Sequence, residues 1–278
     1  MPSLQSVPGV HSTQVLDRTE LAPGVVLLGL HAPELVRVTQ PGHFVMVTPP
    51  SGESAAVALG VYEAQGDRAS IMFFVSGSRT RELAGVSVGR RLDLFGPLGN
   101  GFDLSSGPRD VAIVAGGVGI ASVLLPAQAC IARGARVRLY YGARTASLLV
   151  DAQKFADAGC EVLTSTDDGS AGHHGFITEV LQNDRERPDL ILACGPSPML
   201  RAVGKVAHDT GVPAQLSLEE TFACGVGACW GCVVALDRSS AQAPRFPRLS
   251  TDGNMKNAAV YARVCKEGPV FWAHELRW

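Results

Sequence analysis

Short apolar runs separated by turn residues dominate residues 12–105 of the chain. Runs of about four to eight residues between Gly, Pro and Asp are typical of strands in a small antiparallel β-barrel. Within this part, "SRTRELAGV" (78–86) has the most helical pattern, and Thr80 is available to cap that helix. The predicted strands lie in "GVVLLGLHAP" (24–33), "GHFVMVTPP" (42–50), "VALGVYEA" (57–64), "ASIMFFVSG" (69–77) and "RLDLFGPLG" (91–99).

The pattern changes at about residue 110, where strand-like runs begin to alternate with helical stretches. Such alternation predicts βαβ units and a parallel sheet with helices on both faces. We expect the order 3-2-1-4-5, in which the first and fourth strands flank the point where the order reverses. The predicted strands are "VAIVA" (111–115), "VRLYYG" (137–142), "EVLTST" (161–166), "LILACG" (190–195) and "AQLSLE" (214–219).

Residues 111–132 carry no charge and are long enough to span a bilayer. A glycine cluster, Pro126 and Gln128 interrupt this stretch, so a buried strand, a Gly-rich turn and a helix explain it better. No membrane span is predicted. After residue 219 comes a cysteine-rich segment; residues 237–257 are polar and predicted to be irregular, and 258–276 return to a strand-like pattern.

Composition narrows the possible functions of the 278-residue chain. Its length favours two or three domains, and its formal net charge of −2 gives no reason to expect a nucleic acid or a membrane as partner. The N-terminus shows no secretory signal. An odd count of seven cysteines then favours a reducing compartment, the cytoplasm, where clustered cysteines more often bind metal than form disulfides.

A glycine-rich turn follows the first strand of the predicted parallel sheet, with Gly116, Gly117 and Gly119 before a helix. Glycines at this position let the backbone approach a pyrophosphate, and the N–H groups of a helix N-terminus favour its negative charge. Ser122 occupies the position of the last glycine in the usual spacing, so the motif alone is weak and a purely structural turn is the alternative.

The ends of the other strands add further candidates for a dinucleotide site. Cys194, Gly195 and Pro196 end the fourth strand, where ligands bind in open α/β sheets. Cys194 is either close to a nicotinamide or a buried small apolar residue. Arg144 and Thr145 are candidates for the adenosine side, whereas Asp167 and Asp168 are interpreted as turn residues.

Three of the seven cysteines lie within nine positions, in the spacing Cys224-x4-Cys229-x2-Cys232. This spacing is typical of three ligands of a plant-type [2Fe–2S] cluster, which needs a distant fourth cysteine. Cys265 is the candidate, because the other cysteines lie within the α/β part. The alternatives are a zinc site with four cysteine ligands and reduced thiols in a glycine turn, but only one C-x2-C pair is present.

With these motifs in place, the chain resembles the electron-transfer subunit of NAD-dependent dihydroorotate dehydrogenase, a branch of the ferredoxin-NAD(P) reductase superfamily. The resemblance covers nearly the whole chain. It is carried by "PGHFVMV", "GPLGNGF", "AGGVGIA", "YGART", "TDDGSAGHHGFIT", "ACGPSPML", "VPAQLSLEETFACGVGACWGCVV" and "RVCKEGPVF".

The resemblance implies a fold, cofactors and a partner. The fold is a flavin-type β-barrel (1–106), a Rossmann-like NAD(P)-binding domain (107–218) and a [2Fe–2S] domain (219–278). The cofactors are FAD, NAD(H) and a cluster held by four cysteines, and the partner is an FMN-containing TIM-barrel subunit that oxidises dihydroorotate, in a heterotetramer. Electrons would pass through the cluster and FAD to NAD⁺. The implied cluster ligands are Cys224, Cys229, Cys232 and Cys265; the NAD region also includes Met199.

The expected flavin region departs from the family pattern at three places. An Arg-Pro-aliphatic-Ser segment that grips the flavin phosphates is replaced by Val57-Ala58-Leu59-Gly60, a basic residue by Phe74, and a small residue before Thr80 by Arg79. Loss of a guanidinium–phosphate contact predicts weaker FAD binding, unless Arg79 or Arg81 substitutes for it. The remaining members of this region are Met72 and Phe73.

Two other functions are compatible with these motifs. A flavin-poor iron–sulfur protein would serve for docking or redox sensing, and a related reductase subunit would serve ferredoxin or a hydrogenase. Flavin content separates the flavin-poor protein from an NAD-dependent reductase. The identity of the electron-transfer partner separates a reductase serving ferredoxin or a hydrogenase from one serving dihydroorotate oxidation.

Overall fold

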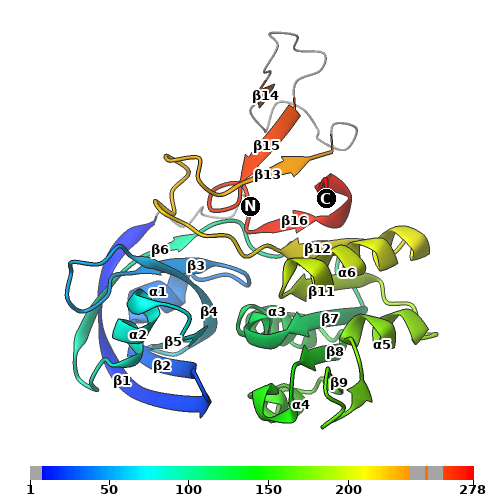
Figure 1. The fold of residues 1–278 in the computed structure, drawn as a ribbon, viewed down its shortest axis with the longest axis horizontal. Helices are drawn as coiled ribbons and strands as arrows, with labels where there is room; N and C mark the ends of the chain where they lie inside the picture. The colour runs from blue at the N-terminus through cyan, green and yellow to red at the C-terminus, as the bar shows by residue number, and fades with distance from the viewer. Residues whose placement is uncertain (1–7, 238–247, 250–258) are drawn as a thin grey trace.

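A barrel and a helix-covered sheet lie side by side, with the C-terminal segment above and between them (Figure 1). The computed structural model describes residues 8–237, 248–249 and 259–278. The barrel is closed and antiparallel, and the five predicted strands of the second unit are parallel to one another. The predicted fold class is therefore confirmed.

The barrel has six strands in the order β1-β2-β5-β4-β3-β6. Five of them are the predicted runs. The sixth, β1, was not predicted, because its exposed positions include the apolar Val10 and Leu16 while its buried positions include the polar Thr13, so no clear alternation marks it. The short helix α1 (Pro33–Val38) was also not predicted. The strands are β1 (Gly9–Ala22), β2 (Val25–His31), β3 (Phe44–Val47), β4 (Val57–Gln65), β5 (Arg68–Phe74) and β6 (Arg91–Leu98).

The predicted helix after β5 is present as α2 (Ser78–Ala84). Thr80 is its third residue, and Gly77 is the N-cap. The Thr80 Oγ1 accepts hydrogen bonds from the backbone N–H groups of Ser76 and Gly77, both at 3.0 Å. Thr80 therefore closes the start of the helix from inside its first turn, and its hydroxyl is fully used there.

The second unit has the strand order β10-β9-β8-β7-β11-β12-β16. Its central five strands follow the predicted order 3-2-1-4-5. The edge strand β10 was not predicted. β16 lies in the stretch 258–276 that was predicted to be strand-like, but its place in this sheet, antiparallel to β12, was not predicted. The strands are β7 (Asp110–Gly116), β8 (Arg136–Ala143), β9 (Glu161–Thr166), β10 (His173–His174), β11 (Leu190–Cys194), β12 (Ala214–Ser217) and β16 (Val270–Trp272).

The glycine turn after β7 does not lead directly into an α-helix. A 3₁₀ helix, η1 (Gly117–Ser122), comes first, and α3 (Leu124–Ile131) follows it. Among the described residues, no helix is both long and apolar enough to cross a membrane. The remaining helices of this unit are η2 (Ala146–Leu148), α4 (Ala152–Asp157), α5 (Ile177–Asn183) and α6 (Ser197–Thr210).

The C-terminal segment forms a small sheet with the order β13-β15-β14 and then returns to the parallel sheet. Its elements are β13 (Val233–Leu236), β14 (Arg248–Leu249), β15 (Ala259–Arg263) and the 3₁₀ helix η3 (Ala273–Glu275). Of the predicted irregular stretch 237–257, only residues 237 and 248–249 are described, and 248–249 form a strand. The domain boundaries stay a prediction, although β16 ties the last segment to the second unit.

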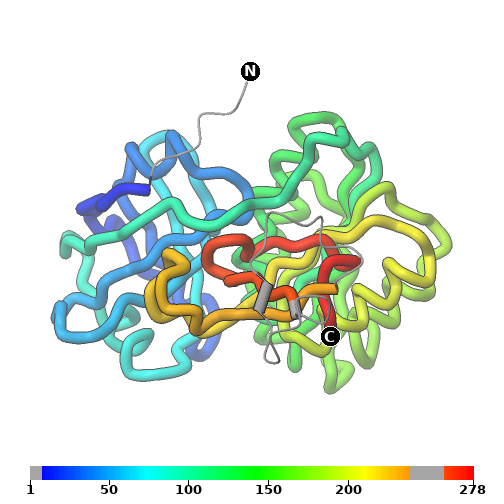
Figure 2. Tube along the Cα trace, turned by 90° about the horizontal axis from the view of Figure 1, so that it is seen from above, coloured from blue at the N-terminus to red at the C-terminus, as the bar shows by residue number. Residues whose placement is uncertain are grey.

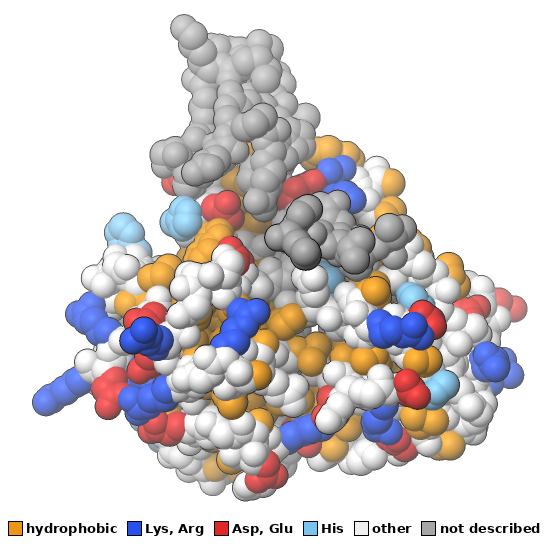
Figure 3. Space-filling model, turned by 180° about the vertical axis from the view of Figure 1, so that it is seen from behind, with side chains coloured by type: hydrophobic (Ala, Val, Ile, Leu, Met, Phe, Trp, Pro, Cys, Tyr) orange, Lys and Arg blue, Asp and Glu red, His pale blue; other side chains and the backbone are white. Residues whose placement is uncertain are grey.

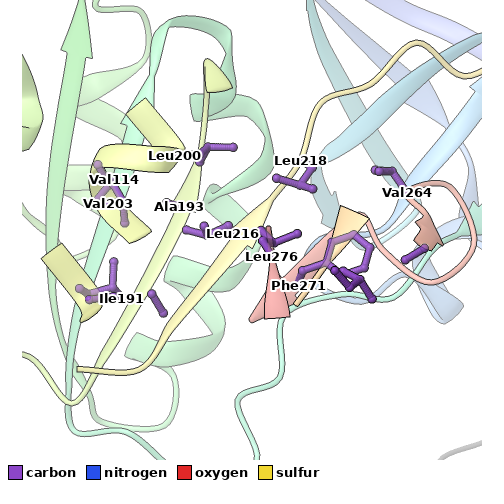
Figure 4. Close-up of a cluster of buried hydrophobic side chains, with 14 of the residues drawn as sticks. Val114, Ile191, Ala193, Leu200, Val203, Leu216, Leu218, Val264, Phe271 and Leu276 are labelled. Atoms are coloured by element: carbon purple, nitrogen blue, oxygen red, sulfur yellow. The ribbon is translucent and has the colours of Figure 1, made fainter. Parts of the chain in front are cut away.

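One apolar core joins all three parts (Figure 4). Phe44 of the barrel packs against Phe222 with ring centroids 5.0 Å apart, and Phe271 of β16 lies in the same cluster. Figure 2 shows the C-terminal segment crossing the junction of barrel and sheet. Asn100 strengthens this contact, because its Nδ2 donates to the Glu267 carbonyl at 2.8 Å. The segment that carries the cysteines is thereby fixed relative to both larger units.

His43 gives this fold a pH dependence that can be measured. It is 6% exposed, its Nδ1 accepts a hydrogen bond from the Gln40 N–H at 3.0 Å, and burial lowers its pKa from 6.5 to about 4. Between these values the unfolded chain binds more protons, so stability falls as the pH falls. By pH 4 the loss attributable to His43 should be ~3 kcal/mol.

Chemical denaturation of the purified protein at several pH values checks this. In His43→Asn the amide oxygen can still accept from Gln40, so this loss should disappear, whereas His208→Gln on the exposed surface should keep it. If the free energy of unfolding falls with pH equally in wild type and in His43→Asn, the assignment to His43 is contradicted.

Candidate functional site

Two cavities meet at the junction of barrel and sheet. The larger, about 770 Å³, lies at the carboxyl ends of β7, β8, β9 and β11, and we call it the sheet cavity. The smaller, about 470 Å³, lies between β4, β5, α2 and the segment after β12, and we call it the barrel cavity. Phe74, Val118 and Glu219 line both. The two cavities therefore adjoin at these three residues.

Five of the predicted dinucleotide residues line the sheet cavity, and another four lie outside its wall. The five are Gly116, Gly117, Arg144, Pro196 and Met199. The other predicted residues, which do not line it, are Gly119, Thr145, Cys194 and Gly195.

Local contacts occupy the predicted residues that do not line the sheet cavity. Gly119 packs against β11, and a Cβ there would lie 2.3 Å from the Cys194 carbonyl oxygen. The Thr145 hydroxyl is hydrogen-bonded to that of Ser147 at 2.9 Å. Gly195 also packs closely, since a Cβ would lie 2.9 Å from the Gly116 nitrogen. Gly119 and Gly195 thus shape the cavity by bringing two strand ends together.

Charged residues at the ends of β8 and β9 occupy different places. Asp167 and Asp168 both lie in the turn after β9, as predicted, and Asp167 also lines the sheet cavity together with Arg144. Hydrogen bonds from the Ser170 hydroxyl at 2.6 Å and N–H at 3.0 Å lower the pKa of the Asp168 carboxyl. Opposite charges are therefore available at the outer end of the sheet cavity.

The barrel cavity brings together every residue of the predicted flavin region. β4 contributes one wall, the end of β5 another, and α2 a third. Glycine at position 60 leaves space at the sheet end, where a Cβ would lie 3.1 Å from the Ser122 Oγ. The lining residues from that region are Val57, Ala58, Leu59, Gly60, Met72, Phe73, Phe74, Arg79 and Thr80.

Glu219 is the main site residue that sequence reasoning missed. It faces both cavities and so has accessible surface, yet protein atoms surround it closely enough that burial raises the pKa of its carboxyl. Its Oε1 lies 3.6 Å from the Sγ of Cys194. Its position at the end of the predicted fifth strand (214–219), where ligands bind in open α/β sheets, was the available signal.

Cys194 lies behind Glu219 and is completely buried. Burial, reinforced by the neighbouring Glu219 carboxylate, raises the pKa of the Cys194 thiol, which therefore stays protonated at neutral pH. Its predicted proximity to a nicotinamide stays a prediction. In this arrangement the group that reaches the cavity junction is the Glu219 carboxyl.

The four predicted cluster cysteines form two pairs. The Cys229 N–H lies 3.4 Å from the Cys224 Sγ, and the Cys265 N–H lies 3.4 Å from the Cys232 Sγ. Burial disfavours the Cys224 thiolate, but N–H groups of Cys229 and Val226 outweigh it and lower the pKa of Cys224 to about 6. Burial and the adjacent Cys232 raise the pKa of Cys265 to about 12.

Arg263 connects the two cysteine segments. Its Nη1 donates to the Gly227 carbonyl at 2.7 Å, and its guanidinium lies 4.8 Å from the ring centroid of Trp230. It also pairs with Glu267. Gly227 has φ +81°, and a Cβ there would lie 2.8 Å from that of Lys266, so glycine permits the close approach. The loop 224–232 is thereby held against the turn that carries Cys265.

The described part of the chain contains no group of three or more His, Cys, Asp or Glu side chains placed around one ion. The metal, its kind and its four cysteine ligands therefore stay a prediction.

Comparison with known proteins places this site in a class. Residues 113–205 match the family described as an oxidoreductase NAD-binding domain. The fold is similar to a solved structure of an NADH-dependent reduced ferredoxin-NADP oxidoreductase, with a TM-score of 0.80 and 27% identity over 96% of this chain and 90% of that one. A ferredoxin reductase from carbazole 1,9a-dioxygenase shares the fold, with a TM-score of 0.65 and 22% identity over 76% of this chain and 68% of that one. The chain is thus an NAD-binding oxidoreductase with a ferredoxin-reductase-like fold.

Closer sequence relatives give the particular family. One, from Caldanaerobacter subterraneus, is 35% identical over 85% of this chain and 86% of its own length. Another, from Listeria monocytogenes, is 32% identical over 95% of this chain and 97% of its own. Both are named electron transfer subunits of dihydroorotate dehydrogenase B (NAD(+)), and the chain belongs to this family.

Two glycine substitutions test how the sheet cavity is built. Gly119→Ala places a Cβ 2.3 Å from a backbone oxygen that cannot move without disturbing β11, and should cost about 2–4 kcal/mol and weaken NADH binding. Gly117 has φ +52° but open space around it, so Gly117→Ala should cost only about 1–2 kcal/mol. Thermal denaturation and NADH titration measure both effects. Equal losses of stability would contradict the close-approach argument.

Proposed function

We propose that this chain carries electrons between a dihydroorotate-oxidising partner subunit and NAD⁺, by way of a [2Fe–2S] cluster and FAD. The contiguity of three sites supports this most directly. The sheet cavity shares Glu219 with the barrel cavity, and the segment 217–222 that lines the barrel cavity leads directly to Cys224. Cofactors bound in these three sites would therefore be neighbours in space.

The sheet cavity is proposed to bind NAD(H). Its position at the carboxyl ends of β7 and β11, where strand order reverses, is where open α/β sheets bind ligands. Gly116 and Gly117 bring bare backbone to the cavity floor, and Arg144 offers a positive charge at its outer end. The name of the relatives supports NAD as the dinucleotide.

The barrel cavity is proposed to bind FAD. Leu59, Met72 and Phe73 give it an apolar wall suited to a flat aromatic ring, and the cavity opens onto the sheet cavity at Glu219. A flavin supplies the exchange between two-electron and one-electron transfer that this function requires. Glu219 can hold one hydrogen bond to a molecule in either cavity, because its carboxyl lies where the two meet.

Cys224, Cys229, Cys232 and Cys265 are proposed to hold the cluster, which would supply one-electron transfer. Backbone N–H groups directed at the thiol sulfurs of Cys224 and Cys232 fit this role, because such contacts stabilise bound thiolates. Apolar residues are exposed beside these cysteines, with Val226 41%, Trp230 37% and Val233 40% accessible. This surface is where we expect the partner subunit to dock.

The word "subunit" in the names of the relatives supports a catalytic partner. We propose an FMN-containing TIM-barrel subunit, a heterotetrameric assembly and a cytoplasmic location. Acidic and basic side chains are mixed over the face shown in Figure 3, without one dominant sign of charge. That distribution is consistent with a protein or small-molecule partner.

A second candidate is a reductase that exchanges electrons with ferredoxin. It is favoured by the TM-score of 0.80 to the NADH-dependent reduced ferredoxin-NADP oxidoreductase. The electron donor separates the two candidates. Anaerobic mixing with a dihydroorotate-oxidising subunit and dihydroorotate, or with reduced ferredoxin, shows which donor reduces this protein.

The visible spectrum of the pure protein, together with iron and flavin analysis, tests the proposal. We expect bands from both a flavin and an iron–sulfur cluster, and NADH should bleach the flavin band, because the two cavities adjoin. With the catalytic subunit present, dihydroorotate should reduce both centres and NAD⁺ should reoxidise them. Iron without flavin, and no response to NADH, would refute the proposed electron path.

Arg263→Gln tests the proposed cluster site. It removes the contacts with Gly227 and Trp230 and the ion pair with Glu267, so the cluster absorbance should be lost to a chelator roughly tenfold faster. Arg277→Gln, at an exposed site, is the matched control. The rate of bleaching by a chelator under anaerobic conditions is the measurement. The same rate in both variants would show that Arg263 does not hold the cluster loop.

A further inference from the structure

The wall of the barrel cavity contains one cationic side chain among the described residues, that of Arg79. The other charged lining residues, Glu219 and Glu220, are acidic. A ligand that carries phosphate groups is repelled by carboxylates and attracted by a guanidinium, which can bind phosphate with two parallel hydrogen bonds. The placement of Arg79 therefore decides where such groups can lie.

Arg79 belongs to the first turn of α2, but its guanidinium reaches across to the start of β4. Its Nη1 donates to the Ala56 carbonyl at 3.2 Å. That bond holds the side chain beside Val57, whose own side chain cannot bind an anion. Arg79 forms no ion pair with any described residue, so most of its N–H donors are available to a ligand.

The barrel cavity has two chemically different ends. β4 runs along it from Val57, next to the Arg79 guanidinium, to Gly60, next to Ser122. These positions are three residues apart, or about 10 Å along a strand. Glu219 lies at the Ser122 end, because the Cys194 thiol contacts both the Ser122 side chain and the Glu219 carboxyl. The Arg79 end and the Glu219 end are thus separated by the apolar wall.

Few other donors compete for an anion at the Val57 end. The Thr80 hydroxyl already accepts two backbone N–H groups and donates to the Gly77 carbonyl at 3.2 Å. Arg81, two residues further on, does not line the cavity. Arg79 is thus the charged group that can meet a phosphate.

We propose that Arg79 anchors the diphosphate of FAD from α2, in the place where position 57 provides no charged side chain. This rests on the proposed function, since it assigns the flavin to the barrel cavity. The aromatic ring system would then lie toward Gly60 and Glu219, and the diphosphate toward Ala56. Binding of FAD would depend on one guanidinium.

Titration of the flavin-depleted protein with FAD and with riboflavin, followed by flavin fluorescence, tests the assignment. Arg79→Gln should raise the Kd for FAD roughly 10- to 100-fold, and Arg79→Lys should raise it less. Riboflavin has no phosphate, so its Kd should change little in either variant. Arg81→Gln, the matched control on the same helix, should leave both values unchanged.

Relocation of the charge gives an independent test. Because the guanidinium lies beside residue 57, Val57→Arg in the Arg79→Gln background should recover at least about tenfold of the lost FAD affinity. A double variant no tighter than Arg79→Gln would overturn the assigned position of the diphosphate. An equal loss of riboflavin and FAD affinity, or no loss of either, would overturn the role of Arg79.

These outcomes are separate from those for the proposed function. A wild-type protein that binds FAD and responds to NADH, with Arg79→Gln indistinguishable from it, refutes only the role of Arg79. A wild-type protein that binds no FAD refutes both.

Discussion

Phe44 of the barrel and Phe222 of the cysteine-bearing segment pack against each other with ring centroids 5.0 Å apart, and this contact continues through Leu218 and Phe271 into the sheet. Burial of apolar surface is the main favourable term in folding, and here it is shared among three parts of the chain. An electron path needs its sites at fixed, short separations. The shared core supplies that constraint, because none of the three parts can shift without exposing apolar surface to water.

Two charged groups at the cavities have defined places. Glu219 reaches both cavities, while Cys194 behind it is buried and protonated. Arg79 lies at the opposite end of the barrel cavity, held by the Ala56 carbonyl. Because Glu219 and Arg79 lie apart, the apolar wall between them is free to pack against an aromatic ring. The charges therefore orient a bound molecule along β4.

The segment that carries the four cysteines is fixed within the fold but partly exposed to solvent. Arg263 ties its loop to the turn carrying Cys265, and Asn100 ties that turn to the barrel. Cys232 and Cys265 are buried, whereas Cys229 is exposed. One side of the four-cysteine group thus faces the interior, and the other faces the surface. A centre placed there can accept an electron from outside the molecule and pass it inward.

The sequence by itself determined five barrel strands, the five parallel strands and the order of the parallel sheet, because apolar periodicity and turn residues act locally along the chain. The residues of the flavin region, which all line the barrel cavity, came from the resemblance to a family. The sequence did not reveal β1, whose apolar residues are divided between its exposed and buried positions, or the place of β16 in the sheet, which depends on a partner strand more than 50 residues away. Only the tertiary structure decided that Gly119 packs against β11 instead of lining the cavity, that Glu219 and not Cys194 reaches the junction, and that Arg79 lies beside Val57. Each of these depends on the distance between segments far apart in the chain, and residue spacing alone contains no record of that distance.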